Sequence, residues 1–152
     1  MESRTESWFR AVILLDTDHF SVLKYRANAR RDVLLERMDQ SEETDFALTP
    51  ITLEEQTRGW LAKIHAAKSA QAEVPFYALL TGLFQYVADW RVVAFDAAAA
   101  ETFDRLRRDR IRIGTMDLKI ASIALTQDAL LLSANLRDFQ QVPGLRVENW
   151  MA

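Results

Sequence analysis

Short apolar runs alternate along the chain with longer segments in which apolar residues recur every three or four positions. The short runs occupy residues 12–15, 46–48, 92–95 and 130–132, and a further extended piece, 145–147, follows the turn signal Pro143-Gly144. Continuous apolar runs of this length are typical of strands that are buried on both faces of a parallel sheet. We therefore expect five strands separated by helices.

The longer segments carry helical periodicity. A stripe with the spacing i, i+3, i+4, i+7 predicts one amphipathic helix, and it consists of Phe76, Leu79, Leu80, Leu83, Phe84 and Val87. A second stripe contains Leu53, Trp60, Leu61 and Ile64, and residues 118–125 are apolar on most sides, as in a buried helix. Asp96 is placed to cap a helix over residues 97–108. Alternating strands and helices indicate an α/β fold with a central, mainly parallel sheet.

Composition limits the classes of protein and site that remain. The chain has 152 residues, of which 49% are hydrophobic and 27% charged, as in one ordinary globular domain. It has no cysteine, which excludes disulfides, thiolate zinc sites and cysteine nucleophiles. No apolar run approaches the roughly 20 residues that span a bilayer. We interpret residues 1–11 as a loosely ordered polar leader and residues 12–152 as a single domain of a cytoplasmic protein without membrane contact.

Three acidic residues stand where α/β proteins build their sites. Asp16 directly follows the first apolar run, and ligands in such folds bind at the carboxyl ends of the strands. Glu55 opens the second amphipathic helix. Thr115 is placed to cap the buried helix, so that Asp117 lies in its first turn. Each also has a purely structural interpretation: a helix cap for Asp16, a capping box with Thr52 for Glu55, and interaction with the helix dipole for Asp117.

The combination of these acids with the C-terminal segment is more specific than any one of them. Over residues 12–151 the chain resembles the PIN-domain, VapC-type toxins of bacterial VapBC toxin–antitoxin pairs. The most specific strings are LLDTDHFSVL, ITLEEQ, IGTMDLKIASIAL and SANLRDFQQVPGLRVENW. The resemblance implies a PIN-like, three-layer α/β/α fold whose acidic side chains gather at one end of the sheet.

The resemblance also implies a function and a set of site residues. It implies an endoribonuclease that hydrolyses RNA with Mg²⁺, or with Mn²⁺ in its place, and whose partners are a cognate antitoxin and a second copy of the chain. Its catalytic positions fall on Asp16, Glu55, Asp117 and Asn135. Asp16 and Asp117 are expected to bind the metal directly, and Glu55 through water or by orienting the nucleophile.

Two positions depart from the family pattern. Many members have Asp where this chain has Asn135, so the site has one negative charge fewer. Asp18 stands where the family often has Asn, and it can return that charge. Ser133 matches a family Thr or Ser that orients the loop and lies near the substrate. The substitution at Asn135 is the only support for an alternative, a catalytically weak PIN-like module that binds RNA or protein.

RNA binding requires a local basic surface, because the net charge is −3. Of the two arginine clusters, the nearer to the third acid contains Arg110 and Arg112, which we expect to contact RNA phosphates. The opposing interpretation is a solvated helix face on which Asp104 and Asp109 neutralise the arginines. The other cluster consists of Arg26, Arg30 and Arg31.

The sequence leaves open the roles of three further residues and one alternative class of protein. His19 has either a structural role or contact with substrate, and His65 is expected at the surface. Trp60 either packs in the core or accepts an antitoxin segment or second subunit. A phosphate-accepting receiver domain would explain Asp16 and Asp18, but the fourth apolar strand has no Lys nearby.

Overall fold

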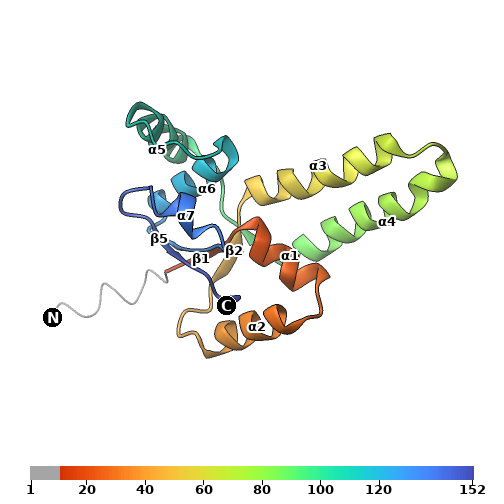
Figure 1. The fold of residues 1–152 in the computed structure, drawn as a ribbon, viewed down its shortest axis with the longest axis horizontal. Helices are drawn as coiled ribbons and strands as arrows, with labels where there is room; N and C mark the ends of the chain where they lie inside the picture. Colours follow the sequence, from red (N-terminus) through yellow and green to blue (C-terminus); the bar gives the residue numbers. More distant parts are fainter. Residues whose placement is uncertain (1–10) are drawn as a thin grey trace.

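A computed structural model describes residues 11–152, so ten of the eleven residues of the expected leader lie outside the described part. It contains one five-stranded sheet with the order β3-β2-β1-β4-β5, in which every neighbouring pair is parallel (Figure 1). The strands are β1 (Ile13–Leu15), β2 (Phe46–Leu48), β3 (Arg91–Val92), β4 (Leu130–Leu132) and β5 (Arg146–Glu148). All five expected strands are confirmed, although β3 begins one residue early and contains only two residues.

Seven helices connect or follow these strands in the described part of the chain. They are α1 (Thr17–Tyr25), α2 (Ala29–Gln40), α3 (Pro50–Ala66), α4 (Ala70–Val87), α5 (Ala97–Arg108), α6 (Thr115–Thr126) and α7 (Leu136–Phe139). The predicted cap of α5 is confirmed, because Asp96 accepts a hydrogen bond from the Ala99 N–H at 2.9 Å. None of these helices is both long and apolar enough to cross a membrane.

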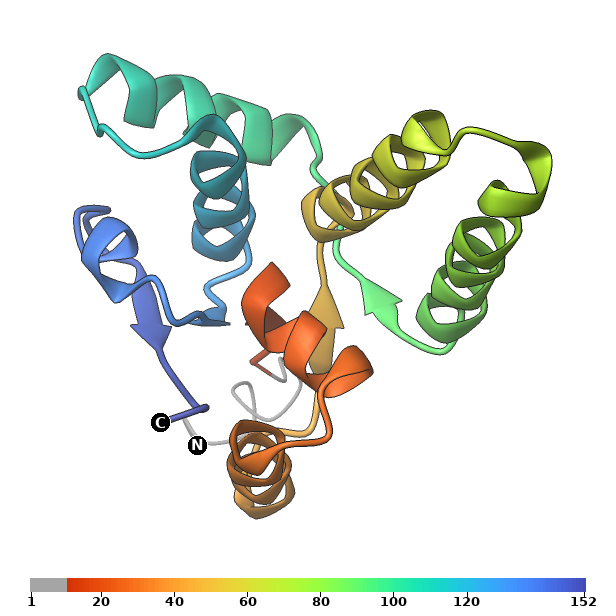
Figure 2. The ribbon, with the colours of Figure 1, turned by 45° about the vertical axis from the view of Figure 1, so that its right-hand side comes forward.

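The sheet separates two apolar layers, because successive side chains of a strand point to opposite faces. Leu14 of β1 packs on one face with the buried residues of α5 and α6. Ile13 and Leu15 pack on the other face, where α1, α2 and α4 contribute Phe20, Leu34 and Leu83. Figure 2 shows helices on both sides of the strands. The expected three-layer α/β/α fold is confirmed.

The helices α3 and α4 form a hairpin that extends away from the sheet (Figure 1). Because α4 packs chiefly against α3, its apolar stripe is only partly covered. Leu83 is 1% exposed, whereas Leu79 and Phe84 are 39% and 57% exposed. The periodicity therefore predicted the helix correctly, but part of the stripe remains at the surface.

Two helix starts differ from the expectation, and both differences affect the site. Helix α3 begins at Pro50, and Thr49 is its N-cap, with the Thr49 Oγ1 accepting from the Thr52 N–H at 3.4 Å. The predicted capping box of Thr52 and Glu55 is therefore wrong, since Glu55 lies beyond the first turn. Gly114, rather than Thr115, caps α6, while Asp117 lies in the first turn as expected.

Candidate active site

Asp16 is a helix cap and a site residue at the same time. It follows β1, where its Oδ1 accepts a hydrogen bond from the Thr17 N–H at 2.8 Å and so caps α1. Its other oxygen, Oδ2, accepts from the Ser133 hydroxyl at 2.8 Å. The side chain is buried, with 7% of the residue exposed. The cap and the site role were alternatives in the sequence, and one carboxylate is placed to serve both.

The loop after β4 is held against the start of α1. Ser133 donates to Asp16 and accepts from the Asn135 N–H at 3.0 Å, while the Ala134 N–H donates to Asp18 Oδ2 at 2.8 Å. This contact follows from the sheet order, because parallel strands β1 and β4 are neighbours and end at the same edge. Ser133 is fully buried, and its hydroxyl orients the loop through these two hydrogen bonds; a role near the substrate stays a prediction.

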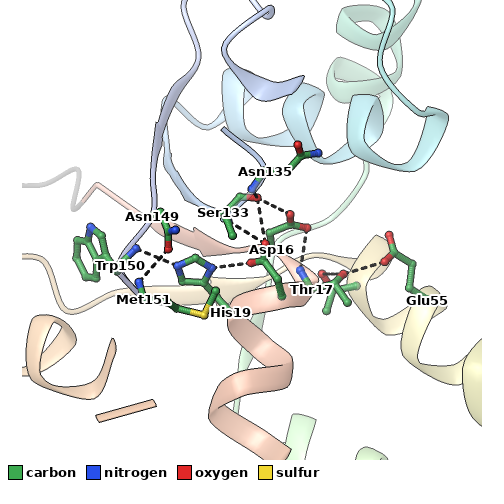
Figure 3. Close-up of polar contacts among 12 residues, drawn as sticks. Asp16, Thr17, His19, Glu55, Ser133, Asn135, Asn149, Trp150 and Met151 are labelled. Carbon is green, nitrogen blue, oxygen red and sulfur yellow. Dashed lines mark hydrogen bonds and ion pairs between the residues drawn. The ribbon is translucent and has the colours of Figure 1, made fainter. Parts of the chain in front are cut away.

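Glu55 reaches the same edge from α3. Its Oε2 accepts from the Thr17 hydroxyl at 3.0 Å, and the Thr17 and Thr52 hydroxyl oxygens are 3.2 Å apart (Figure 3). Burial and the charge of Asp117 raise the pKa of Glu55 above its ordinary value, against the hydrogen bond from Thr17. Glu55 therefore lies within electrostatic range of Asp117 and is hydrogen-bonded to Thr17, the residue next to Asp16.

Asp117 lies in α6, and the side chain of Asn135 forms hydrogen bonds to both Asp117 and Asp138. The sequence pattern did not single out Asp138. The Asn135 Nδ2 donates to Asp117 Oδ2 at 3.3 Å and to Asp138 Oδ2 at 3.1 Å. Burial, followed by the charge of Asp138, raises the pKa of Asp117. The i, i+3 spacing of Asn135 and Asp138 across the start of α7 was the available signal. Asp138 thus supplies a negative charge beside the position where the family often has Asp.

Asp18 also carries a negative charge, but donors within the protein occupy both of its oxygens. Burial acts to raise its pKa, yet hydrogen bonds from His19 and Ala134 outweigh burial and lower the pKa below its ordinary value. Asp18 is therefore an ionised neighbour of Asp16 whose oxygens are already hydrogen-bonded. His19 is fully buried, which favours the structural role over contact with substrate.

Asp16, Glu55 and Asp117 together carry more negative charge than the surrounding protein neutralises. Burial, together with the charges of Asp18 and Asp117, raises the pKa of Asp16 to about 7, although hydrogen bonds from Ser133 and Thr17 act in the opposite direction. Within residues 11–152, no Lys or Arg forms an ion pair with Asp16, Glu55 or Asp117. The favourable partner for such a group of oxygens is a cation.

The donor chemistry fits a hard divalent cation, although the acids do not form a closed cage. Among the described residues, no three Asp, Glu or His side chains are grouped tightly enough to hold an ion by themselves. Carboxylates without a cation repel one another, which favours such separation. Mg²⁺ usually takes one or two carboxylates and keeps several waters, so it does not need a complete protein cage. Oxygen donors suit Mg²⁺ or Mn²⁺ better than zinc.

The arginines before α6 line a surface cavity at the start of that helix. Arg107, Arg110 and Arg112 line it together with Thr115 and Leu118, and its volume is about 330 Å³. In the part of the chain that the structure describes, none of these three arginines pairs with Asp104 or Asp109. The guanidinium groups therefore remain available to an anion.

The chain is similar in sequence to known ribonucleases. No family model matches the chain. It is 31% identical over 91 residues to the tRNA(fMet)-specific endonuclease VapC of Shigella flexneri, which covers 57% of this chain and 67% of that protein. It is 30% identical over 69 residues to ribonuclease VapC2 of Rickettsia felis, covering 43% of this chain and 52% of the relative.

A solved structure shares the fold over nearly the whole chain. One chain of the crystal structure of DNA-bound VapBC from Salmonella typhimurium superposes with a TM-score of 0.66 at 24% identity, covering 92% of this chain and 98% of that one. The sheet, the placement of the three acids and the sequence relatives together exclude the receiver-domain interpretation. This chain belongs to the VapC family of ribonucleases.

Proposed function

We propose that this protein is the toxin of a toxin–antitoxin pair and cleaves RNA as a metal-dependent endoribonuclease. The observation that carries the proposal is the group of Asp16, Glu55 and Asp117, which no Lys or Arg of the described residues pairs with and which lies at the edge of the sheet where β1 and β4 end. Their raised pKa values have the same causes, burial and repulsion by neighbouring carboxylates. A site with these properties binds a divalent cation in preference to staying empty, and the cation stabilises the fold.

The side chains divide the work according to their contacts. Asp16 and Asp117 are the proposed direct ligands, because the charge of Asp117 acts on the Asp16 carboxylate and each acid is hydrogen-bonded to the loop of residues 133–135. Glu55 orients a water for attack on the phosphate, and Thr17 fixes the carboxylate by donating at 3.0 Å. When bound, Mg²⁺ or Mn²⁺ supplies Lewis-acid polarisation of the phosphate and lowers the pKa of a coordinated water.

The arginine cavity provides a path for the RNA backbone. Thr115 and Leu118, which line the cavity, flank Asp117 in the same helix. We propose that Arg110 and Arg112 bind a phosphate near the scissile bond, since guanidinium groups bind phosphates with several hydrogen bonds at once. Because the Shigella relative is named a tRNA(fMet)-specific endonuclease, tRNA is the first RNA to test, in the cytoplasm where it resides.

The hairpin of α3 and α4 offers surfaces for the two protein partners. A cavity of about 220 Å³ is lined by both Glu55 and Trp60, so an antitoxin segment placed on Trp60 would also cover the site. A more apolar groove of about 380 Å³ includes Pro50, Leu53 and Leu61, and we assign it to a second copy of the chain. Light scattering of the purified protein tests the dimer: a monomer at high concentration would exclude it.

A matched pair of variants tests the enzymatic proposal against the catalytically weak binding module. Glu55→Gln removes the charge at the site, whereas Glu54→Gln removes a neighbouring charge that pairs with Arg58 at the surface. Cleavage of tRNA is measured with Mg²⁺, with Mn²⁺ and with EDTA, using identically purified proteins. We expect cleavage by the wild type and Glu54→Gln only when metal is present, and strong loss in Glu55→Gln. Metal-independent cleavage, or equal activity of the two variants, would reject the proposal.

A further inference from the structure

A buried histidine connects the C-terminal segment to the acidic site. His19 lies in the first turns of α1 and has no exposed surface. Its Nδ1 is 2.6 Å from Asp18 Oδ1, and its Nε2 is 3.1 Å from the Trp150 backbone nitrogen (Figure 3). The histidine therefore bridges two segments that are separated by 131 positions in the chain.

The two partners determine which ring nitrogen carries the proton. A backbone N–H can only donate, so Nε2 accepts from Trp150 and carries no hydrogen. The hydrogen of the neutral ring is then on Nδ1, which donates to Asp18. Since both nitrogens are engaged, the ring is fixed in its plane and the position of the Asp18 carboxylate follows from it.

Asp18 passes this constraint to the loop after β4. Its second oxygen, Oδ2, accepts from the Ala134 N–H at 2.8 Å and lies 3.4 Å from the Ser133 hydroxyl. The next residue in that loop is Asn135, whose side chain lies between Asp117 and Asp138. A shift of the Asp18 carboxylate would therefore change where Asn135 meets Asp117.

The other end of this series of hydrogen bonds is firmly anchored. Trp150 is 7% exposed, and its ring packs edge-on against Phe46 with the centroids 6.2 Å apart. The Arg37 guanidinium lies 5.2 Å from the Trp150 ring and also donates to the Asn149 carbonyl at 3.1 Å. The backbone N–H that orients His19 is thus held by contacts from α2 and β2.

We propose that His19 is a positioning residue of the nuclease site, which holds Asp18 and, through it, the loop of residues 133–135 in register with Asp117. The effect on cleavage rests on the proposed function, whereas the effect on the loop does not. His19 itself touches neither substrate nor metal. Its role requires one particular tautomer and two specific partners, so a side chain that fills the same space without these hydrogen bonds cannot replace it.

Two amide substitutions separate the two hydrogen bonds of the ring. In His19→Asn the amide nitrogen can take the place of Nδ1 and still donate to Asp18, but no atom reaches Trp150. In His19→Gln the amide oxygen can take the place of Nε2 and accept from Trp150, but the donor to Asp18 is lost. Both remove part of a buried ring, so both lower the melting temperature. His65→Gln, at an exposed histidine of α3, is the control for histidine loss.

The positioning role predicts that cleavage does not follow stability. We expect His19→Gln to lose roughly tenfold to a hundredfold in kcat, the usual worth of a bond to a charged group, with little change in KM. His19→Asn should retain clearly more activity than His19→Gln, even if it melts at a lower temperature. Activity that tracks the melting temperature, with His19→Gln at least as active as His19→Asn, would overturn the proposal.

A readout without metal or RNA keeps the inference separate from the proposed function. Amide hydrogen exchange at Ala134, followed by NMR in the metal-free protein, should accelerate in His19→Gln and stay near the wild-type rate in His19→Asn. Asp18→Asn, which serves if the histidine variants do not fold, should accelerate the same amide while distant amides of α5 stay unchanged. Equal protection of Ala134 in all folded variants would overturn the proposal. A wild type that fails to cleave RNA would reject the proposed function alone.

Discussion

The Ser133 hydroxyl donates to Asp16 Oδ2 across 2.8 Å, although 117 positions separate the two residues in the chain. This bond joins the ends of β4 and β1 inside the protein, where both residues are buried. It links the loop that carries Asn135 to the acid with the most strongly raised pKa in the site.

Ser133→Ala removes that donor without adding volume. The pKa of Asp16 should rise further, because the hydrogen bond that now lowers it is absent. We expect a loss of about 1–3 kcal/mol in unfolding free energy, typical of a buried group that loses its partner, and weaker Mg²⁺ binding at pH 7. Calorimetric titration with Mg²⁺ at pH 7 and pH 8.5 tests this. Identical affinity in variant and wild type at both pH values would contradict it.

The stability of the metal-free protein should fall as the pH rises. The pKa of Asp16 is about 7 in the folded protein and about 3.9 in an unfolded chain, so the folded state binds more protons between these values. The contribution of Asp16 to stability is therefore complete below pH 4 and is lost as the pH rises through 7. Burial shifts Glu55 and Asp117 in the same direction.

Thermal melts in EDTA at pH 5 and pH 8 measure this dependence. Asp16→Asn can still cap α1 but has no carboxyl proton to lose, so its melting temperature should change less between the two pH values. Mg²⁺ should raise the wild-type melting temperature at pH 8 and leave that of Asp16→Asn nearly unchanged. A wild type that is more stable at pH 8 than at pH 5 without metal would contradict the raised pKa.

Asp117→Asn distinguishes a metal ligand from a residue that only complements the helix dipole. As a ligand, Asp117 is essential, so the variant should bind Mg²⁺ weakly and lose cleavage while its metal-free fold is equally or more stable. As a dipole partner, it would contribute about 0.3–1 kcal/mol of stability, and the variant would remain active. Melts with and without Mg²⁺, beside a cleavage assay, decide between these outcomes.

The arginine cavity should act on RNA affinity more than on chemistry. The double substitution Arg110→Ala/Arg112→Ala should raise KM for RNA and make its salt dependence less steep. For single-stranded RNA, the log–log slope should fall by roughly 0.7 for each phosphate that the variant no longer binds. The matched control is Arg26→Ala/Arg30→Ala in the other cluster. If both double variants change the slope equally, general surface charge rather than this cavity attracts the RNA.

Local patterns in the sequence were enough to predict the strands and most helices. The apolar runs around Leu14 and Leu131 are short and continuous because these strands are buried on both faces, and this property is visible in a few consecutive residues. The positions of Asp16 and Asp117 could be predicted for the same reason. Each lies next to an element whose pattern is local, and the parallel sheet brings strand ends to one edge.

The partners of the site residues depended on tertiary structure. The sequence was compatible with a capping box between Thr52 and Glu55. Because α3 begins earlier than that box requires, the Glu55 carboxylate instead accepts a hydrogen bond from Thr17. Asp138 became part of the site only through the side chain of Asn135, and His19 found its partner at Trp150, 131 positions away. Hydrophobic periodicity reports which face of an element is buried, but hydrogen-bond partners at such separations are set by strand order and by the loop that the folded sheet places opposite them.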